Sequence, residues 1–134
     1  MKKVLSTASI AIVMLLLLFS LFGCNKYTSS YKAVAFAHTN TSKNAHMSFS
    51  SFEGTMVFKL KCESGDEKIN YSANLESGSA KVFYDCDGTK IELFSVNAGD
   101  EISDIGGALK KGTLYIIVEM SEVGKNGRFN FDIK

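Results

Sequence analysis

The sequence predicts an all-β protein: an antiparallel, jelly-roll-like β-sandwich of about seven or eight strands after an N-terminal signal helix. Three observations support this prediction. Apolar and polar residues alternate with a period of two over five segments after Glu53. Turn residues separate these segments at roughly 10-residue intervals. No segment after Cys24 shows the 3.6-residue period of an amphipathic helix.

The first 23 residues have the three parts of an export signal. Met1-Lys2-Lys3 carries two positive charges, Ile10–Phe19 is entirely apolar, and Ser20–Gly23 leads to Cys24. A segment of this kind is removed from the mature protein, so the fold must be sought in the residues that follow.

The four residues Leu21-Phe22-Gly23-Cys24 make the signal more specific. They resemble the lipobox of bacterial lipoproteins, with Leu at the third position before the Cys and a small Gly directly before it. Phe22 departs from the small residue that is usual in the middle of that box. The resemblance implies cleavage before Cys24, a diacylglycerol on its thiol, and a protein held by lipid on the extracytoplasmic face of the cell membrane.

Two other interpretations of this segment remain open. Val4–Phe22 comprises 19 residues, which is long enough to span a bilayer as an uncleaved anchor. The segment can also be an ordinary secretory signal in which Cys24 is coincidental.

The chain divides into a signal peptide at 1–23, a lipidated Cys with a polar tether at 24–30, and one β-sandwich domain at 31–134. The signal peptide holds two Lys and no acidic residue, so the mature chain carries 13 basic and 14 acidic side chains. A net charge of −1 without a basic stripe argues against nucleic-acid binding.

The strands are expected in the following order. Tyr31–His38 alternates weakly and predicts a first strand, and the polar stretch Thr39–Ser51 predicts a long loop. Five clear runs then bury one face each. Their inward residues are expected to be Met56, Phe58, Leu60 and Cys62; Ile69, Tyr71, Ala73 and Leu75; Ala80, Val82, Tyr84 and Cys86; Leu114, Ile116, Val118 and Met120; and Phe129, Phe131 and Ile133.

One further run and two turns complete the expected sheet. Ile91–Val96 is apolar on both faces, which suits a central strand or a strand covered by a loop. Asp87-Gly88 and Asn126-Gly127 are typical of two-residue type I′ turns. They predict two tight hairpins, pairing 80–86 with 89–96 and 114–121 with 128–133.

The last 60 or so residues resemble secreted β-sandwich modules of the bacterial pre-peptidase C-terminal type. The similarity lies in an Asp-Gly turn, a segment of the form L-x-x-G-T-x-Y-x-x-V and a final Phe-rich strand. The residues that carry it are Leu109, Gly112, Thr113, Tyr115 and Val118. The resemblance implies a secreted β-sandwich module and no specific ligand.

With Cys24 lipidated, Cys62 and Cys86 are the two remaining cysteines. Outside the cell such a pair can form a disulfide. Both residues also fall on the inward face of their strands, where free thiols are commonly buried. The pattern leaves both states open.

Three aromatic residues, Phe83, Phe94 and Tyr115, fall on the outward face of their strands. Gathered on one sheet face, they can form a ligand patch. The alternative is that a loop or the N-terminal strand covers them.

The sequence shows no arrangement typical of catalysis or metal binding. His38 and His46 lie in or beside the polar segment, belong to no motif and are expected on the surface. Asp85 and Asp87 are better explained by a strand end and its turn, and their spacing does not match an EF-hand loop. We therefore expect no metal, no cofactor and no catalytic residue.

The sequence favours a membrane-anchored extracytoplasmic lipoprotein that acts as a non-catalytic binding or interaction module, with an envelope protein or a glycan as partner. Two alternatives are a structural envelope lipoprotein without a small ligand, and a small enzyme or enzyme inhibitor. Neither the ligand nor the oligomeric state follows from the sequence.

Overall fold

A computed structural model describes residues 27–134 of the chain. The signal peptide, Cys24 and its lipid lie outside the described residues, so the expectations for them stay predictions. Within residues 27–134 no helix is long and apolar enough to cross a membrane.

The described part is built from eight strands, two of which are much longer than the others. In chain order they are β1 (Ser30–Val34), β2 (Ala37–Asn40), β3 (Asn44–Cys62), β4 (Ile69–Ser77), β5 (Ser79–Asp85), β6 (Ile91–Asn97), β7 (Glu101–Gly106) and β8 (Gly112–Ile133). β3 has 19 residues and β8 has 22, and the two pair antiparallel from end to end.

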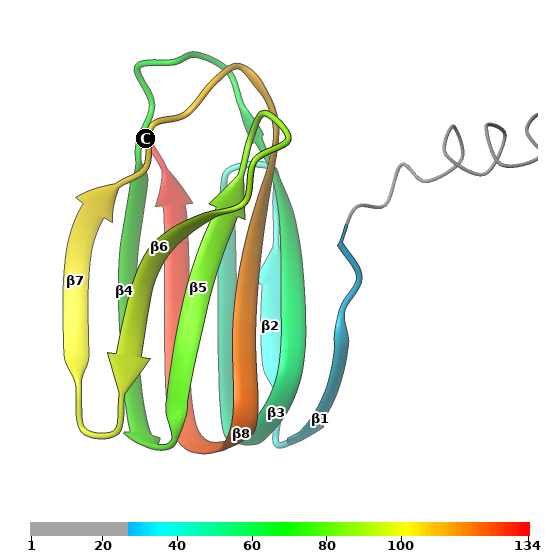
Figure 1. The fold of residues 1–134 in the computed structure, drawn as a ribbon, viewed down its shortest axis with the longest axis vertical. Helices are drawn as coiled ribbons and strands as arrows, with labels where there is room; N and C mark the ends of the chain where they lie inside the picture. Colours follow the sequence, from blue (N-terminus) through cyan, green and yellow to red (C-terminus); the bar gives the residue numbers. More distant parts are fainter. Residues whose placement is uncertain (1–26) are drawn as a thin grey trace, which may run out of the picture.

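The long strands belong to both layers of an antiparallel β-sandwich, as Figure 1 shows. In one layer, called the β5/β6 sheet, the order is β1, the second half of β3, the first half of β8, β5 and β6. In the other, the β4/β7 sheet, the order is β2, the first half of β3, the second half of β8, β4 and β7. The predicted fold class is confirmed.

The chain passes from one sheet to the other five times at the lower end of Figure 1. Four crossings contain a residue with positive φ: Ala35 at 50°, Gly54 at 120°, Gly78 at 91° and Gly99 at 84°. Small residues suit these sites because a side chain at positive φ is strained, and because the backbones come close together. The fifth crossing lies in β8 and contains Gly124, which lies next to Gly78.

The core lies between the two sheets and contains nearly all the residues expected to face inward. Four Phe side chains are fully buried there, two from β3 and two from β8: Phe52, Phe58, Phe129 and Phe131. Of the expected inward residues, only Tyr71 and Cys86 are partly exposed, and both pack against this core. The alternation after Glu53 therefore identified the buried face of each of these five runs correctly.

The long loop expected at Thr39–Ser51 is wrong, because β3 begins at Asn44. Ala45, Met47 and Phe49 are buried, and polar side chains alternate with them on the outer face. The outer residues Asn44, His46, Ser48 and Ser50 are all polar, so the average hydropathy of the segment resembles that of a loop even though its alternation is that of a strand. The expected first strand also differs, since it is divided into β1 and β2.

One of the two predicted hairpins is wrong and the other has a longer turn. Residues 114–121 and 128–133 do not pair with each other, because both belong to β8 and lie in different sheets. Asn126 instead takes a positive φ of 49° inside the strand. β5 and β6 do form a hairpin, but Tyr84 pairs with Ile91, so a two-residue turn at Asp87-Gly88 is not formed.

β6 is an edge strand and not the central strand offered as one explanation of Ile91–Val96. The pairing with β5 shifts by one residue at Leu93, which is a β-bulge. The bulge brings Leu93 and Phe94 both against the core. Because the bulge reverses the alternation within the strand, inward-facing residues occur at odd positions before it and at even positions after it. This explains why Ile91–Val96 has apolar residues at both odd and even positions.

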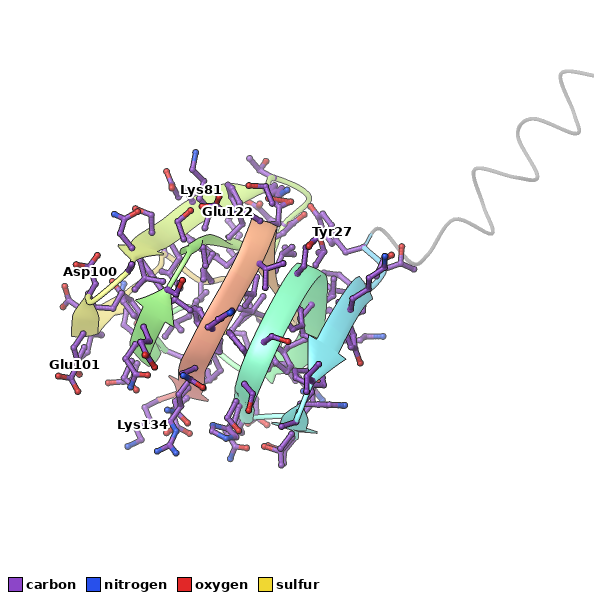
Figure 2. The ribbon with its side chains drawn as sticks, turned by 90° about the horizontal axis from the view of Figure 1, so that it is seen from below. Tyr27, Lys81, Asp100, Glu101, Glu122 and Lys134 are labelled. Carbon is purple, nitrogen blue, oxygen red and sulfur yellow. The ribbon has the colours of Figure 1, made fainter. Side chains whose placement is uncertain are left out.

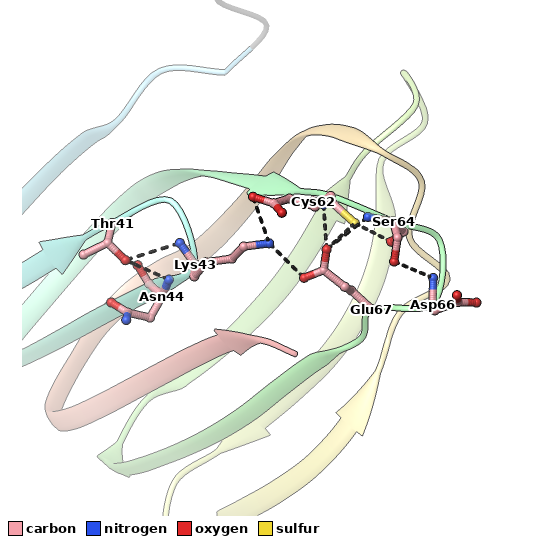
Figure 3. Close-up of polar contacts among 8 residues, drawn as sticks. Thr41, Lys43, Asn44, Cys62, Ser64, Asp66 and Glu67 are labelled. Carbon is pink, nitrogen blue, oxygen red and sulfur yellow. Dashed lines mark hydrogen bonds and ion pairs between the residues drawn. The ribbon is translucent and has the colours of Figure 1, made fainter.

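A polar network closes the β3–β4 connection at the end opposite the crossings, as Figure 3 shows. The Glu67 carboxylate accepts hydrogen bonds from the backbone N–H groups of Glu63 at 2.6 Å and Ser64 at 3.0 Å. Lys43 lies 2.9 Å from its other oxygen. These contacts, the Lys43 hydrogen bond first, lower the pKa of Glu67.

Candidate functional site

The outer face of the β4/β7 sheet is a grid of short polar side chains, and it is the first candidate site. We call it the polar face. Three cross-strand rows make it up. The rows are Thr39, His46, Asn130, Ser72 and Ser103; Ala37, Ser48, Arg128, Asn74 and Glu101; and Asn44, Asp132, Asn70 and Ile105.

Three adjoining hollows run along the polar face. A hollow of about 480 Å³ is lined by Asn70, Ser72 and Asn130 among others, and one of about 410 Å³ shares Ser72 and Asn130 with it. A third, of about 400 Å³, shares Asn74 and Arg128 with the second. Because neighbouring hollows have lining residues in common, together they form one shallow trough over β7, β4 and β8 that reaches β3 at one end.

Side chains in the middle row are held by hydrogen bonds to one another. His46 Nδ1 donates to Asn130 Oδ1 at 2.6 Å, which fixes the proton on that ring nitrogen. The Asn130 amide then donates to Ser72 Oγ at 3.3 Å. This ordering leaves the free donors and acceptors of the row in defined positions.

The polar face carries little charge. Arg128 is the cation of the grid, and Glu101 and Asp132 are its carboxylates. Tyr71 lies at the border of the largest hollow, where its ring stacks on Phe94 at 4.5 Å. Burial, and then the charge of Asp104, raises the pKa of the Tyr71 phenol, so it is a neutral hydroxyl at physiological pH.

The outer face of the β5/β6 sheet is of a different kind, and we call it the aromatic face. One cross-strand row there consists of Val57, Ile117 and Phe83. Tyr115 lies on the same face beside this row, and the Tyr27 ring meets it edge-on at 5.4 Å. Ile117 is only 1 % exposed although it points away from the core, so the neighbouring side chains cover it.

Asp85 is a buried carboxylate on the aromatic face, with 2 % of its surface exposed. It accepts hydrogen bonds from Tyr27 Oη at 2.6 Å and from the Gly88 N–H at 2.7 Å, as well as from the Asp87 N–H at 3.2 Å. Burial, followed by the Asp85 hydrogen bond, raises the pKa of Tyr27 to about 12. The two backbone bonds fold the β5–β6 loop around the carboxylate, in place of the expected type I′ turn.

The three aromatic residues expected to form a ligand patch are separated in the structure. Phe83 and Tyr115 lie on the aromatic face, where the Lys90 ammonium is 4.4 Å from the centre of the Phe83 ring. Phe94 packs inward against Tyr71 and Phe131. The bulge at Leu93 is the physical reason, because it reverses the direction in which Phe94 points.

Both remaining cysteines are free thiols in the structure. Cys62 is buried, and burial raises the pKa of its thiol. Cys86 is half-buried, with its Sγ 3.6 Å from the Ala108 carbonyl. The structure therefore shows no disulfide between Cys62 and Cys86, and the strand β8 lies between β3, which ends at Cys62, and β5, which Cys86 follows.

Neither histidine is placed in a catalytic arrangement. His38 is exposed and stacks on Phe36 at 5.0 Å, while His46 belongs to the polar face. Among residues 27–134, no three His, Cys, Asp or Glu side chains are grouped to hold a metal ion.

Sequence reasoning missed the polar face because four of its 14 residues, Thr39, Asn44, His46 and Ser48, lie in the segment expected to be a loop. The signal that identifies it is the alternation of Ala45, Met47 and Phe49 with His46 and Ser48. Six more are outward residues of β4 and β8, whose direction was predicted correctly but whose common composition was not noticed. Three belong to β7, which was not predicted as a strand.

Comparison with known proteins finds similar solved structures but no matching family. No protein-family profile and no curated protein matches the sequence. Similar solved structures include a periplasmic inhibitor of g-type lysozyme from Aeromonas hydrophila, PliG (17 % identity, 69 % of this chain and 88 % of that one, TM-score 0.49). The carbohydrate-binding module TmCBM61, solved with β-1,4-galactotriose, has 12 % identity over 79 % of this chain and 87 % of that one, with a TM-score of 0.49.

The resemblance expected from the C-terminal motif also has a counterpart. The pre-peptidase C-terminal domain of a collagenase from Bacillus anthracis matches with 13 % identity over 79 % of this chain and 89 % of that one, with a TM-score of 0.40. At these identities, and with TM-scores below 0.5, the similarities carry no argument about this chain.

Proposed function

We propose that this chain is a non-catalytic binding module, held by lipid at Cys24 on the extracytoplasmic face of a bacterial membrane, and that the polar face binds a glycan. The trough of three adjoining hollows on this face is the observation that carries the proposal. The anchor follows from the lipobox-like segment.

The chemistry of the polar face favours a polyhydroxylated partner. Amide and hydroxyl groups of Asn and Ser both donate and accept hydrogen bonds, as sugar hydroxyls do. Several of these side chains, including Asn70, Asn74 and Asn130, are half-buried, so they are positioned before a ligand arrives.

A protein partner is less well matched to this face. Interfaces between proteins usually contain a buried cluster of Tyr, Trp, Phe or Met at their centre. The rows of the polar face contain only Ala37 and Ile105 as apolar side chains, and these lie on its outermost strands. A surface that hydrogen-bonds across its centre and has no apolar anchor is better suited to a polar chain lying along it.

The binding part of the proposal is tested on a glycan array with the purified protein and two substitutions. Asn130→Ala removes the hydrogen-bond link of the middle row, and Arg128→Ala removes the cation of the grid. We expect each to weaken binding about tenfold, which corresponds to roughly 1.4 kcal/mol. Lys81→Ala, on the aromatic face, is the matched control and should bind like the unaltered chain.

Two results would contradict this part of the proposal. One is a protein that binds no glycan, and the other is glycan binding that both polar-face substitutions leave unchanged. Binding to peptides alone would indicate a protein partner and would also overturn it. The anchor is tested separately by labelling with palmitate, which must be lost in Cys24→Ser.

A further inference from the structure

The N-terminal end of the described chain is fastened to the aromatic face. Tyr27 packs against Tyr115, and its hydroxyl donates a hydrogen bond to the buried Asp85 carboxylate. Two residues later, Ser29 Oγ accepts a hydrogen bond from the Val57 N–H at 2.9 Å. The segment expected to be part of a tether is therefore in contact with the domain from Tyr27 onward.

This contact limits where a lipid on Cys24 can lie. Tyr27 is three residues further along the chain than Cys24, and an extended chain advances at most about 3.6 Å per residue. The anchor is thus within roughly 11 Å of the aromatic face. Figure 2 shows Tyr27 and Lys81 toward one side of the sandwich and Glu101 and Lys134 toward the other.

The residues around Tyr27 are those that suit a membrane surface. Tyr and other aromatic rings collect at the interface between lipid and water, and Lys side chains reach from there to the headgroups. The aromatic face carries Tyr27, Phe83 and Tyr115. Its lysines are Lys32, Lys59, Lys61, Lys81 and Lys90, against the carboxylates Glu53, Asp85, Glu92 and Glu119.

The two outer faces differ in the sign of their net charge. Five lysines face four carboxylates on the aromatic face, and one of these carboxylates is the buried Asp85. The polar face has two carboxylates and one Arg. An anionic surface therefore attracts the first face and repels the second.

We propose that the aromatic face lies on the bilayer, in contact with anionic lipid headgroups, so that the polar face points away from the membrane. This inference rests on the lipid anchor of the proposed function. The sheets of a sandwich are about 10 Å apart, so the proposed glycan trough lies on the far side of the domain and stays open to ligands from outside the cell.

The absence of Trp from the sequence permits a direct test, because one introduced Trp is then the only indole in the chain. The lipidated full chain is reconstituted into vesicles of phosphatidylcholine with or without phosphatidylglycerol, each containing a lipid that quenches Trp emission. Phe83→Trp reports on the aromatic face. Ile105→Trp, at a site 61 % exposed on the polar face, is the matched control.

We expect the Trp at position 83 to be quenched about twofold more strongly than the Trp at 105, because interfacial side chains lie roughly 5–10 Å into the headgroup region. The difference should be larger with phosphatidylglycerol. Tyr115→Trp serves as a second reporter if Phe83→Trp does not fold. Equal quenching at both faces, or stronger quenching at 105, would overturn the proposal.

The outcome separates this inference from the proposed anchor. Flotation of the protein with the vesicles, together with the mass of a lipidated Cys24, shows whether the anchor exists. A protein that does not float contradicts the anchor itself and the inference with it. A protein that floats without preferential quenching at 83 contradicts only the orientation.

Discussion

Replacing Gly54 with Ala should break the junction between β1 and β3. Gly54 has a φ of 120°, and a Cβ built there lies 2.3 Å from the Ser30 carbonyl oxygen and 2.7 Å from the Tyr31 Cα. Both atoms belong to the backbone of β1, so no side-chain rotation can relieve the contact. An ordinary contact at 3.4 Å requires β1 to move by about 1 Å, and that displacement takes its hydrogen bonds beyond their normal length.

The size of the effect has two parts. A residue with a side chain at such a φ costs of order 1–3 kcal/mol. Loss of two or three β1–β3 hydrogen bonds adds about 2–3 kcal/mol at roughly 1 kcal/mol each. The total, about 3–6 kcal/mol, is a large part of the 5–15 kcal/mol typical of a domain.

Gly112→Ala is the matched control. Gly112 has a similar φ of 134°, but a Cβ there meets no atom within 4 Å. Urea unfolding of both variants should therefore show a loss for Gly112→Ala limited to the strain of about 1–3 kcal/mol. Hydrogen exchange should show β1 unprotected in Gly54→Ala only. Equal destabilisation of the two variants, with β1 still protected, would refute the reasoning.

Three further predictions concern individual side chains. Tyr27→Phe removes a hydrogen bond to a carboxylate and should lower the free energy of unfolding by about 1.5 kcal/mol; unchanged urea midpoints would contradict the contact. The lowered pKa of Glu67 means that its contribution is complete above pH 4.5 and is lost as pH falls through the lower folded value. Glu67→Gln should flatten this acid limb of the stability curve, and a curve of unchanged shape would argue against it. Under native conditions a thiol reagent should modify the half-buried Cys86 much faster than the buried Cys62, as measured by mass spectrometry of peptides.

Alternation predicted the fold and the core because burial acts on each strand locally. Every second residue from Met56 to Cys62 is buried, as a half-exposed strand requires. The same rule applies to Asn44–Phe49, where it was overlooked since short polar residues made the segment resemble a loop. In this segment the two-residue period of apolar side chains, rather than the average hydropathy, indicates the strand.

Pairing was harder to predict, because it depends on contacts far apart in the sequence. Asn126-Gly127 has the composition of a tight turn, yet Gly127 lies opposite both Leu75 and Phe49 within a continuous strand. The competing contacts with β3 and β4 outweigh the local preference for a hairpin. Likewise, nothing adjacent to Phe94 indicates the bulge that turns it inward.

The two candidate faces could not be recognised from the sequence either, because each is formed by residues of several paired strands. The composition of single strands does not show that His46, Asn130 and Ser72 form one row, because these residues come from three strands. The contact between Tyr27 and Asp85 joins positions 58 residues apart. Both sites become visible only when the register between strands is known.

The position of β8 determines when the domain can fold. β8 lies between β3 and β4 in one sheet and between β3 and β5 in the other. Asn44 pairs with Asp132, so the ribbon that joins both sheets closes a loop of almost the whole domain. Contacts of this range are slow to form, and before β8 is available β3, β4 and β5 lack the strand that joins them. Neither sheet can therefore be completed until β8 has been synthesised, so we expect the two sheets to form together, late, rather than one after the other.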